Sequence, residues 1–208
     1  MISNIIWDLD GTIFDTWPAN SRAYYNAISI LGEEASYRWI KDELCLIPYQ
    51  YRFSTLAEKY GLDVDAVKRE FKSEYTKIPA NDCPPFKGVK SVLRHINSIN
   101  GVNVIVTNRE RGGAIRFLNA YNMMDYFARV ISNDDGYPAK PDPTAFRVVI
   151  EDFGLDLPDT ICIGDSESDI IAGQAVGLFS CLYGDFPHQV QPDLVFNDYA
   201  DLYSQMWV

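Results

Sequence analysis

Short apolar segments that alternate with helical patterns constrain the fold of this 208-residue chain more than any other feature. Six such segments are typical of buried strands, and they span residues 4–8, 102–107, 129–131, 160–164, 179–183 and 194–196. Between most of them, apolar residues recur at helical spacing, as in Val89, Val92 and Ile96. Strands that alternate with helices predict an α/β fold whose parallel sheet is covered by helices on both faces.

One long interval, from about Thr16 to about Lys87, contains helical patterns but no segment typical of a strand. Two apolar stripes in it end at Gly32 and Gly61, and Asp63 is placed to cap a further helix. A connection of this length is too long for a simple crossover, so it is either a second domain or a lid. We therefore predict a core formed by residues 1–15 and 88–208, with residues 16–87 as a helical insertion.

Charge and cysteine content exclude several classes of function. The formal net charge of −11 argues against nucleic acid or an anionic membrane as the main partner. A small anionic substrate stays compatible with it if the pocket carries its own positive charge. The four cysteines form no C-x-x-C pair, so we expect no zinc site. No segment approaches transmembrane length, and we expect a cytoplasmic protein.

Polar residues follow three of the predicted strands, at the edge where parallel sheets bind their ligands. Residues 8–12 read Asp-Leu-Asp-Gly-Thr, 107–109 read Thr-Asn-Arg, and 164–169 read Gly-Asp-Ser-Glu-Ser-Asp. Lys140 precedes the fourth strand and can reach the same edge. Carboxylates, a hydroxyl, an amide and an ammonium group brought together in this way predict metal-assisted chemistry on a phosphate.

The carboxylates have distinct predicted roles. Asp8, Asp10 and Asp165 provide the hard oxygen ligands that Mg²⁺ prefers. Asp8, held rigidly at the end of a strand, is the predicted nucleophile and would form an aspartyl-phosphate. Asp10 lies where the chain already turns at Gly11, and it is the predicted general acid and, in the second step, the general base.

Four further residues complete the predicted site. The Thr107 hydroxyl, the Asn108 backbone N–H and the Lys140 ammonium are expected to hold the oxygens of the transferred phosphoryl group. Asp169 falls one helical turn after Asp165, and we expect it to orient metal-bound water or Lys140 from behind the metal ligands.

These four stretches, in this order, resemble the motifs of the haloacid dehalogenase superfamily, whose members are mostly phosphatases. The subfamily that the chain resembles is the one of the phosphoglycolate-phosphatase and β-phosphoglucomutase type. The resemblance implies a Rossmann-like core, a magnesium ion and a mobile helical cap inserted after the first strand. It also implies that Asp10 contacts the ion through its backbone carbonyl, which leaves its carboxylate for proton transfer.

Substrate specificity is expected to lie in the insertion, because the core binds only the phosphate. Residues 49–52, in a loop after a short helix, resemble a stretch that relatives point into the pocket, and Arg52 could pair there with a substrate anion. Arg109, next to Asn108, could also face the substrate. The alternative for both arginines is an ordinary solvated surface charge.

The predicted function is a magnesium-dependent phosphatase acting on a small phosphorylated metabolite, as a monomer or a homodimer. A sugar-phosphate phosphomutase with the same acids is the alternative. A receiver-like signalling domain would place its phosphoacceptor after the third strand, near Asn133, and would be much shorter. A non-catalytic binding protein is disfavoured by the intact set Asp8, Asp10, Lys140 and Asp165.

Overall fold

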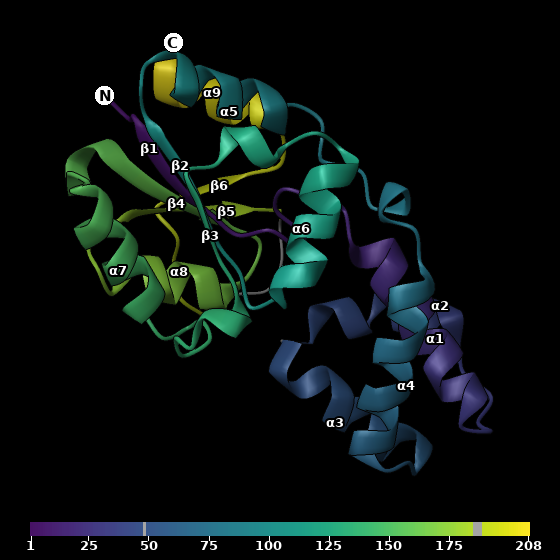
Figure 1. Cartoon of the computed structure of the whole chain (residues 1–208). Helices are drawn as coiled ribbons and strands as arrows, with labels where there is room; N and C mark the ends of the chain where they lie inside the picture. Colours follow the sequence, from purple (N-terminus) through teal and green to yellow (C-terminus); the bar gives the residue numbers. More distant parts are fainter. Residues whose placement is uncertain (48, 185–188) are drawn as a thin grey trace. The chain divides into compact units, whose positions relative to one another are not determined.

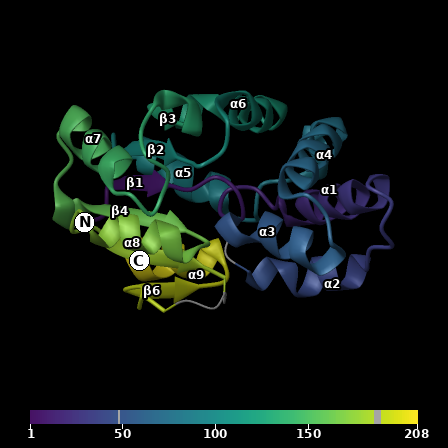
Figure 2. The same cartoon turned by 90° about the horizontal axis from the view of Figure 1, so that it is seen from below.

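Six parallel strands form one sheet in the computed structural model, which describes residues 1–47, 49–184 and 189–208; the side chains of Cys45, Tyr49 and Gln50 lie outside the described part. The strands are β1 (Asn4–Trp7), β2 (Val102–Val106), β3 (Arg129–Ile131), β4 (Thr160–Gly164), β5 (Phe179–Tyr183) and β6 (Leu194–Phe196). Their order is β3-β2-β1-β4-β5-β6, and Figure 2 shows it from β3 at the top of the view to β6 at the bottom. The predicted α/β fold with a Rossmann-like parallel sheet is confirmed.

The sheet is sandwiched between two layers of helices. The helices of this part of the chain are α5 (Val89–Ser98), α6 (Arg111–Ala120), α7 (Thr144–Phe153), α8 (Glu167–Gln174) and α9 (Tyr199–Trp207). Figure 1 shows α5 and α9 on one face of the sheet and α7 and α8 on the other. Helix α6 connects β2 to β3.

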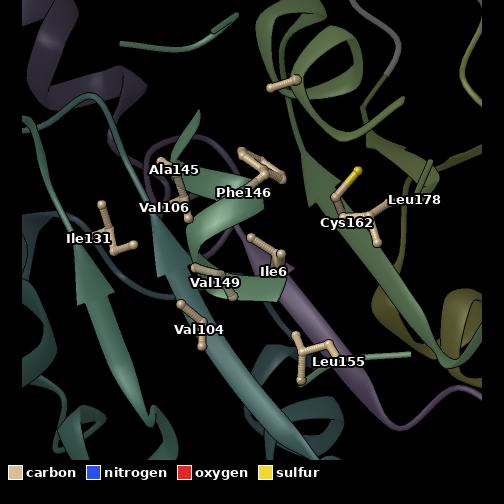
Figure 3. Close-up of a cluster of buried hydrophobic side chains, with 11 residues drawn as sticks. Ile6, Val104, Val106, Ile131, Ala145, Phe146, Val149, Leu155, Cys162 and Leu178 are labelled. Atoms are coloured by element: carbon tan, nitrogen blue, oxygen red, sulfur yellow. The ribbon is translucent and has the colours of Figure 1, made fainter. Parts of the chain in front are cut away.

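The alternation of side chains along each strand builds the two halves of the core. Ile6, Val104 and Cys162 are register partners on neighbouring strands, and they point toward Phe146 and Val149 of α7 (Figure 3). All five are at most 2 % exposed. Side chains one position along a strand point to the opposite face, so each strand contributes to both layers.

A buried polar contact marks that opposite face. Trp7 on β1 is fully buried, and its indole Nε1 donates to Asn103 Oδ1 on β2 at 2.9 Å. Asn103 Nδ2 in turn donates to the Leu93 carbonyl of α5 at 3.2 Å. These bonds satisfy polar groups that would otherwise be costly to bury, and they fix the residue directly before Asp8.

The chain divides into two compact units, one of residues Met1–Asp15 and Pro84–Val208, and one of residues Thr16–Cys83. We call the second unit the insertion. Its helices are α1 (Trp17–Ile30), α2 (Tyr37–Asp42), α3 (Tyr49–Tyr60) and α4 (Val64–Lys77). Residues 84–87 group with the sheet-containing unit, where Phe86 N donates to the Ile13 carbonyl at 2.9 Å.

The insertion has a core of its own. The apolar stripes of its helices meet in one cluster, which contains Tyr24, Ile28, Ile40, Leu44, Leu56, Ala57 and Val67. Asp63 caps α4 as the sequence predicts, because its Oδ1 accepts from Ala66 N at 2.8 Å. The loop predicted at residues 49–52 is wrong: α3 begins at Tyr49, and no Gly or Pro interrupts residues 49–60.

None of the helices in the described part of the chain combines the length and the apolar character that a membrane crossing requires.

Candidate active site

Strand pairing brings Asp8 next to Asp165. Trp7 is the register partner of Ile163, and Asp8 N donates to the Ile163 carbonyl at 2.8 Å. Asp8 and Asp165 therefore leave two adjacent strands at the same edge of the sheet. Carboxylate oxygens of Asp8, Asp165 and Asp169 all lie within 4.8 Å of one another. Residues 8–12 and 164–169, which are far apart in the sequence, thus lie next to each other in the structure.

The turn after Asp8 packs directly against Asp165. Gly11 has φ +76°, a left-handed conformation that glycine adopts without strain. A Cβ at this position would lie 2.1 Å from Asp165 Oδ2. Glycine is therefore required twice at position 11, for the backbone conformation and for the approach of the carboxylate.

Lys140 joins two of the acids. Its Nζ lies 2.6 Å from Asp8 Oδ1, 2.6 Å from Asp169 Oδ1 and 2.7 Å from the Val106 carbonyl oxygen. The Lys140 side chain is 3 % exposed, so these contacts are shielded from water. The Asn108 amide fixes the Lys140 backbone from both sides, accepting from Lys140 N at 2.9 Å and donating to its carbonyl at 3.2 Å. The ends of β1 and β2 and the start of α8 are linked through this one lysine.

Asp169 is held by the start of its own helix. Its Oδ2 accepts from Ser166 N at 3.2 Å and from Ser166 Oγ at 2.6 Å, and Ser166 and Asp169 form the capping box of α8. With Oδ1 on Lys140 and Oδ2 on Ser166, both oxygens of Asp169 have protein partners. Asp169 thus links Lys140 to the start of α8, and the orienting role predicted for it stays a prediction.

The buried acids carry more negative charge than the protein around them neutralises. The pKa of Asp8 is raised to about 7, mainly by burial. The positive charge of Lys140 lowers this pKa, whereas the negative charges of Asp169 and Asp10 raise it further. Burial also raises the pKa of Asp165 well above its ordinary value, and Asp8 and Asp169 add to this effect. Burial lowers the pKa of Lys140, but Asp169 and Asp8 outweigh it and keep the ammonium charged.

A divalent cation fits this balance. Within the described part of the site, four carboxylates, those of Asp8, Asp10, Asp165 and Asp169, stand against the two cationic groups of Lys140 and Arg109. With all four ionised, two negative charges would be left over, and the raised pKa values of Asp8 and Asp165 reflect the cost of ionising them without a cation. The donors are hard oxygens of the kind that Mg²⁺ prefers. The chemistry of this donor set therefore suits a magnesium ion.

Asp10 is engaged by Arg109. The guanidinium donates from Nε to Asp10 Oδ2 at 2.7 Å and from one Nη to Asp10 Oδ1 at 2.6 Å, a two-point ion pair. The Asp10 carboxylate is absent from the cluster formed by the other three acids, and its side chain is 29 % exposed. From the sequence we expected that Arg109 could face the substrate. In the structure it contacts Asp10, the predicted general acid.

Thr107 lies at the end of β2, buried beside the acids. Its backbone N donates to the Ile131 carbonyl at 2.9 Å, and its Oγ1 accepts from Arg109 N at 3.1 Å. The predicted phosphate-binding residues Thr107, Asn108 and Lys140 are thus brought together at one edge of the sheet.

Comparison with known proteins agrees with this geometry. The sequence pattern of the haloacid dehalogenase-like hydrolases matches residues 5–183, which is most of the chain. The chain belongs to this family. A phosphoglycolate phosphatase from Yersinia pseudotuberculosis is 27 % identical over 214 residues, which cover 97 % of this chain and 91 % of that protein.

Two solved structures show the same fold. One is a predicted phosphoglycolate phosphatase from Haemophilus somnus, 21 % identical, with a TM-score of 0.83 and coverage of 98 % of this chain and 97 % of that one. The other is a Bacillus subtilis protein assigned to the haloacid dehalogenase hydrolases and bound to magnesium, 19 % identical, with a TM-score of 0.76 and coverage of 100 % and 99 %. The predicted family is confirmed, and the relatives' activity supports the predicted phosphatase class.

Arg52 lies in the insertion, on α3 of this family member. Its Nε donates to the Ile47 carbonyl at 2.8 Å, and its guanidinium carbon lies 4.9 Å from the centroid of the Trp17 ring. Both contacts are internal to the insertion, and the role proposed for Arg52 toward a substrate stays a prediction.

Sequence reasoning missed two residues that support the site. Ser166 caps α8 and binds Asp169, and the spacing Ser-x-x-Asp is a signal that could have revealed it. Tyr199 on α9 is 1 % exposed, and its hydroxyl donates to the Thr12 carbonyl at 2.8 Å. No local sequence pattern predicts the contact of Tyr199, because its partner Thr12 is distant in the sequence.

We predict that Gly164→Ala loosens the site. A Cβ at Gly164 would lie 2.2 Å from Asp169 Cβ and 2.5 Å from Asp169 Oδ2, so Asp169 would have to move away from Lys140. We expect a loss of about 1–3 kcal/mol in the free energy of unfolding, measured by urea denaturation. Gly112→Ala is the matched control, since nothing lies within 4 Å of a Cβ there and the residue lies in α6 with no positive φ. Equal stability of Gly164→Ala and the parent would show that this packing is not tight.

Proposed function

We propose that this chain is a magnesium-dependent phosphatase that hydrolyses a small phosphate monoester through an aspartyl-phosphate on Asp8. The observation that carries the proposal is the position of Asp8, which directly follows the buried strand β1 and lies beside Asp165, with its Oδ1 bound by Lys140 at 2.6 Å. A carboxylate so fixed presents its other oxygen in one direction, as in-line attack on phosphorus requires. The names of the relatives make 2-phosphoglycolate the first substrate to test.

The residues divide the reaction into two steps. Asp8 Oδ2 forms a bond to phosphorus while the ester P–O bond breaks, and the leaving oxygen takes a proton from Asp10. Asp10 then removes a proton from a water molecule that attacks the phosphoryl group, which releases phosphate and restores Asp8. Lys140, the Thr107 hydroxyl and the Asn108 backbone N–H stabilise the phosphoryl oxygens.

Asp8 and Asp165, with the Asp10 backbone carbonyl, are the residues that would hold Mg²⁺. When bound, the ion supplies positive charge that lets an anionic nucleophile approach an anionic ester. The excess negative charge of the site supports this assignment. Asp169 stays in its orienting role, because Ser166 and Lys140 bind both of its oxygens.

We expect Mg²⁺ to stabilise the protein against thermal unfolding. At a concentration of 100 Kd the gain is about 2.7 kcal/mol, which is roughly 5–10 °C in Tm for a chain of this size. Asp165→Asn should remove this gain and, because it removes one of the repelling charges, raise the Tm of the metal-free protein. Differential scanning calorimetry with and without MgCl₂, at matched ionic strength, measures both effects. An undiminished Mg²⁺ response in Asp165→Asn would contradict the assignment of Asp165 as a ligand.

Release of inorganic phosphate tests the function itself. The purified protein is incubated with p-nitrophenyl phosphate and a panel of phosphorylated metabolites in MgCl₂, and free phosphate is measured. A phosphatase releases phosphate in proportion to substrate consumed. The phosphomutase alternative predicts interconversion of sugar-phosphate isomers without net release.

The insertion is proposed to act as the cap of this enzyme and to supply its substrate specificity. Its separate apolar core supports this role, since a unit with its own core can move as a body. The boundaries of the two parts are proposed near residues 16 and 84–87.

A further inference from the structure

The ion pair between Asp10 and Arg109 is incompatible with the proposed role of Asp10 as general acid. Both carboxylate oxygens of Asp10 accept hydrogen bonds from the guanidinium, at 2.6 and 2.7 Å. A group that protonates a leaving oxygen must come within hydrogen-bond distance of that oxygen. Asp10 paired with a guanidinium is a carboxylate, so it must give up at least one contact to Arg109 and take up a proton from solvent before it can protonate the leaving oxygen.

Arg109 is held in place from behind. Its guanidinium carbon lies 4.8 Å from the centroid of the Phe117 ring on α6, a cation–π contact. Gly113 leaves room for the side chain, since a Cβ there would lie 3.0 Å from one Nη and 3.2 Å from Cδ of Arg109. Arg109 N also donates to Thr107 Oγ1 at 3.1 Å, which ties the residue to the end of β2. The Arg109 side chain is only 15 % exposed, so the guanidinium is pre-positioned at the site.

We propose that Arg109 holds Asp10 in the substrate-free enzyme and that a second anionic group on the substrate takes Arg109 in exchange, which frees Asp10 for proton transfer. Arg109 is then a positioning residue for Asp10 and a specificity determinant. The fork of a guanidinium binds a carboxylate or a phosphate in the same two-point manner, so the exchange replaces one pair by an equivalent one. Substrates with an anion on the leaving group would be preferred over uncharged esters of the same size.

This inference rests on the proposed phosphatase activity, and its test uses three substrates on the 208-residue chain in MgCl₂. The first is 2-phosphoglycolate, an alkyl ester with a carboxylate on the leaving group. The second is 2-hydroxyethyl phosphate, an alkyl ester of similar size without that charge. The third is p-nitrophenyl phosphate, whose leaving group departs without a proton, so that the first step of its reaction does not depend on Asp10.

The parent protein should prefer the carboxylate ester over the uncharged ester by about tenfold or more in kcat/KM, the scale of one charge-assisted hydrogen-bonded contact. Arg109→Gln should lower kcat/KM for the carboxylate ester about tenfold or more. The same change should leave kcat for the uncharged ester equal or higher, because Asp10 is no longer held. The burst rate of p-nitrophenolate release, which reports the first step alone, should stay within about threefold.

Two further variants keep the test sharp. Arg109→Lys retains the charge without the fork and should give an intermediate preference, which is measurable even if the glutamine variant folds poorly. Arg129→Gln is the matched control, since it breaks the Arg129–Asp152 ion pair of 2.5 Å at the opposite end of the strands and should alter no preference.

The outcomes separate the two proposals. If Arg109→Gln lowers the rates on all three substrates alike, or leaves the preference unchanged, Arg109 is structural and the inference is wrong while the phosphatase stands. If the parent releases no phosphate from any of the three substrates, the proposed function itself fails.

Discussion

Asp8→Asn is expected to abolish phosphate release, with kcat reduced by about 10⁴-fold or more. The amide has nearly the same shape as the carboxylate, but its oxygen is a poor nucleophile toward phosphorus. Lys140 would keep its contacts with Asp169 and the Val106 carbonyl, so the arrangement around position 8 should survive. Phosphate release from p-nitrophenyl phosphate in saturating MgCl₂ measures the effect.

Two controls accompany this experiment. Circular dichroism should show an unchanged fold in Asp8→Asn. Mass spectrometry of acid-quenched parent enzyme should show the added mass of one phosphoryl group, and the variant should show none. Retention of full turnover by Asp8→Asn would end the case for an aspartyl-phosphate.

Asp10→Asn is expected to lower kcat by about a hundredfold or more on alkyl phosphates, the usual scale for a lost general acid. The loss should depend on the substrate in a way that the Asp8 variant's loss does not. With p-nitrophenyl phosphate the first step needs no proton, so Asp8 is still phosphorylated. Hydrolysis of that intermediate then lacks its general base and becomes rate-limiting.

Rapid-quench kinetics tests this division of roles. Asp10→Asn should release a burst of p-nitrophenolate close to one equivalent per enzyme, followed by a slow steady state. The parent should show a smaller burst or none. A variant with a parent-like steady state on every substrate would show that Asp10 transfers no proton in either step.

Much of the sheet could be predicted because its strands are buried on both faces. The segments around Ile5, Ile105 and Ile161 are short, apolar and bounded by polar turns, and each forms the strand expected of it. Their spatial order could not be read from any one segment. Asp8 meets Asp165 because β1 lies between β2 and β4, and that choice depends on how all the helices pack.

The contacts of individual side chains were the least predictable part of the site. Arg109 follows Asn108 directly in the chain, but the direction of its side chain depends on Gly113 and Phe117, in the first and second turns of α6. A guanidinium on a long side chain can reach several partners, and the choice among them is made by packing. The Tyr199 bond to the Thr12 carbonyl joins residues 187 positions apart. The capping pair Ser166 and Asp169, in contrast, had a short-range pattern that could have been recognised.

The shared lysine has a consequence for how this enzyme can evolve. Because Lys140 contacts Asp8, Asp169 and the end of β2, and Asn108 fixes its backbone, a substitution at any one of these positions changes the environment of the others. Double-mutant cycles among them should therefore be strongly non-additive. Evolution of a different reaction at this edge of the sheet would therefore require several simultaneous substitutions among Lys140, Asp8, Asp169 and Asn108. Residues that contact none of these four can be substituted one at a time.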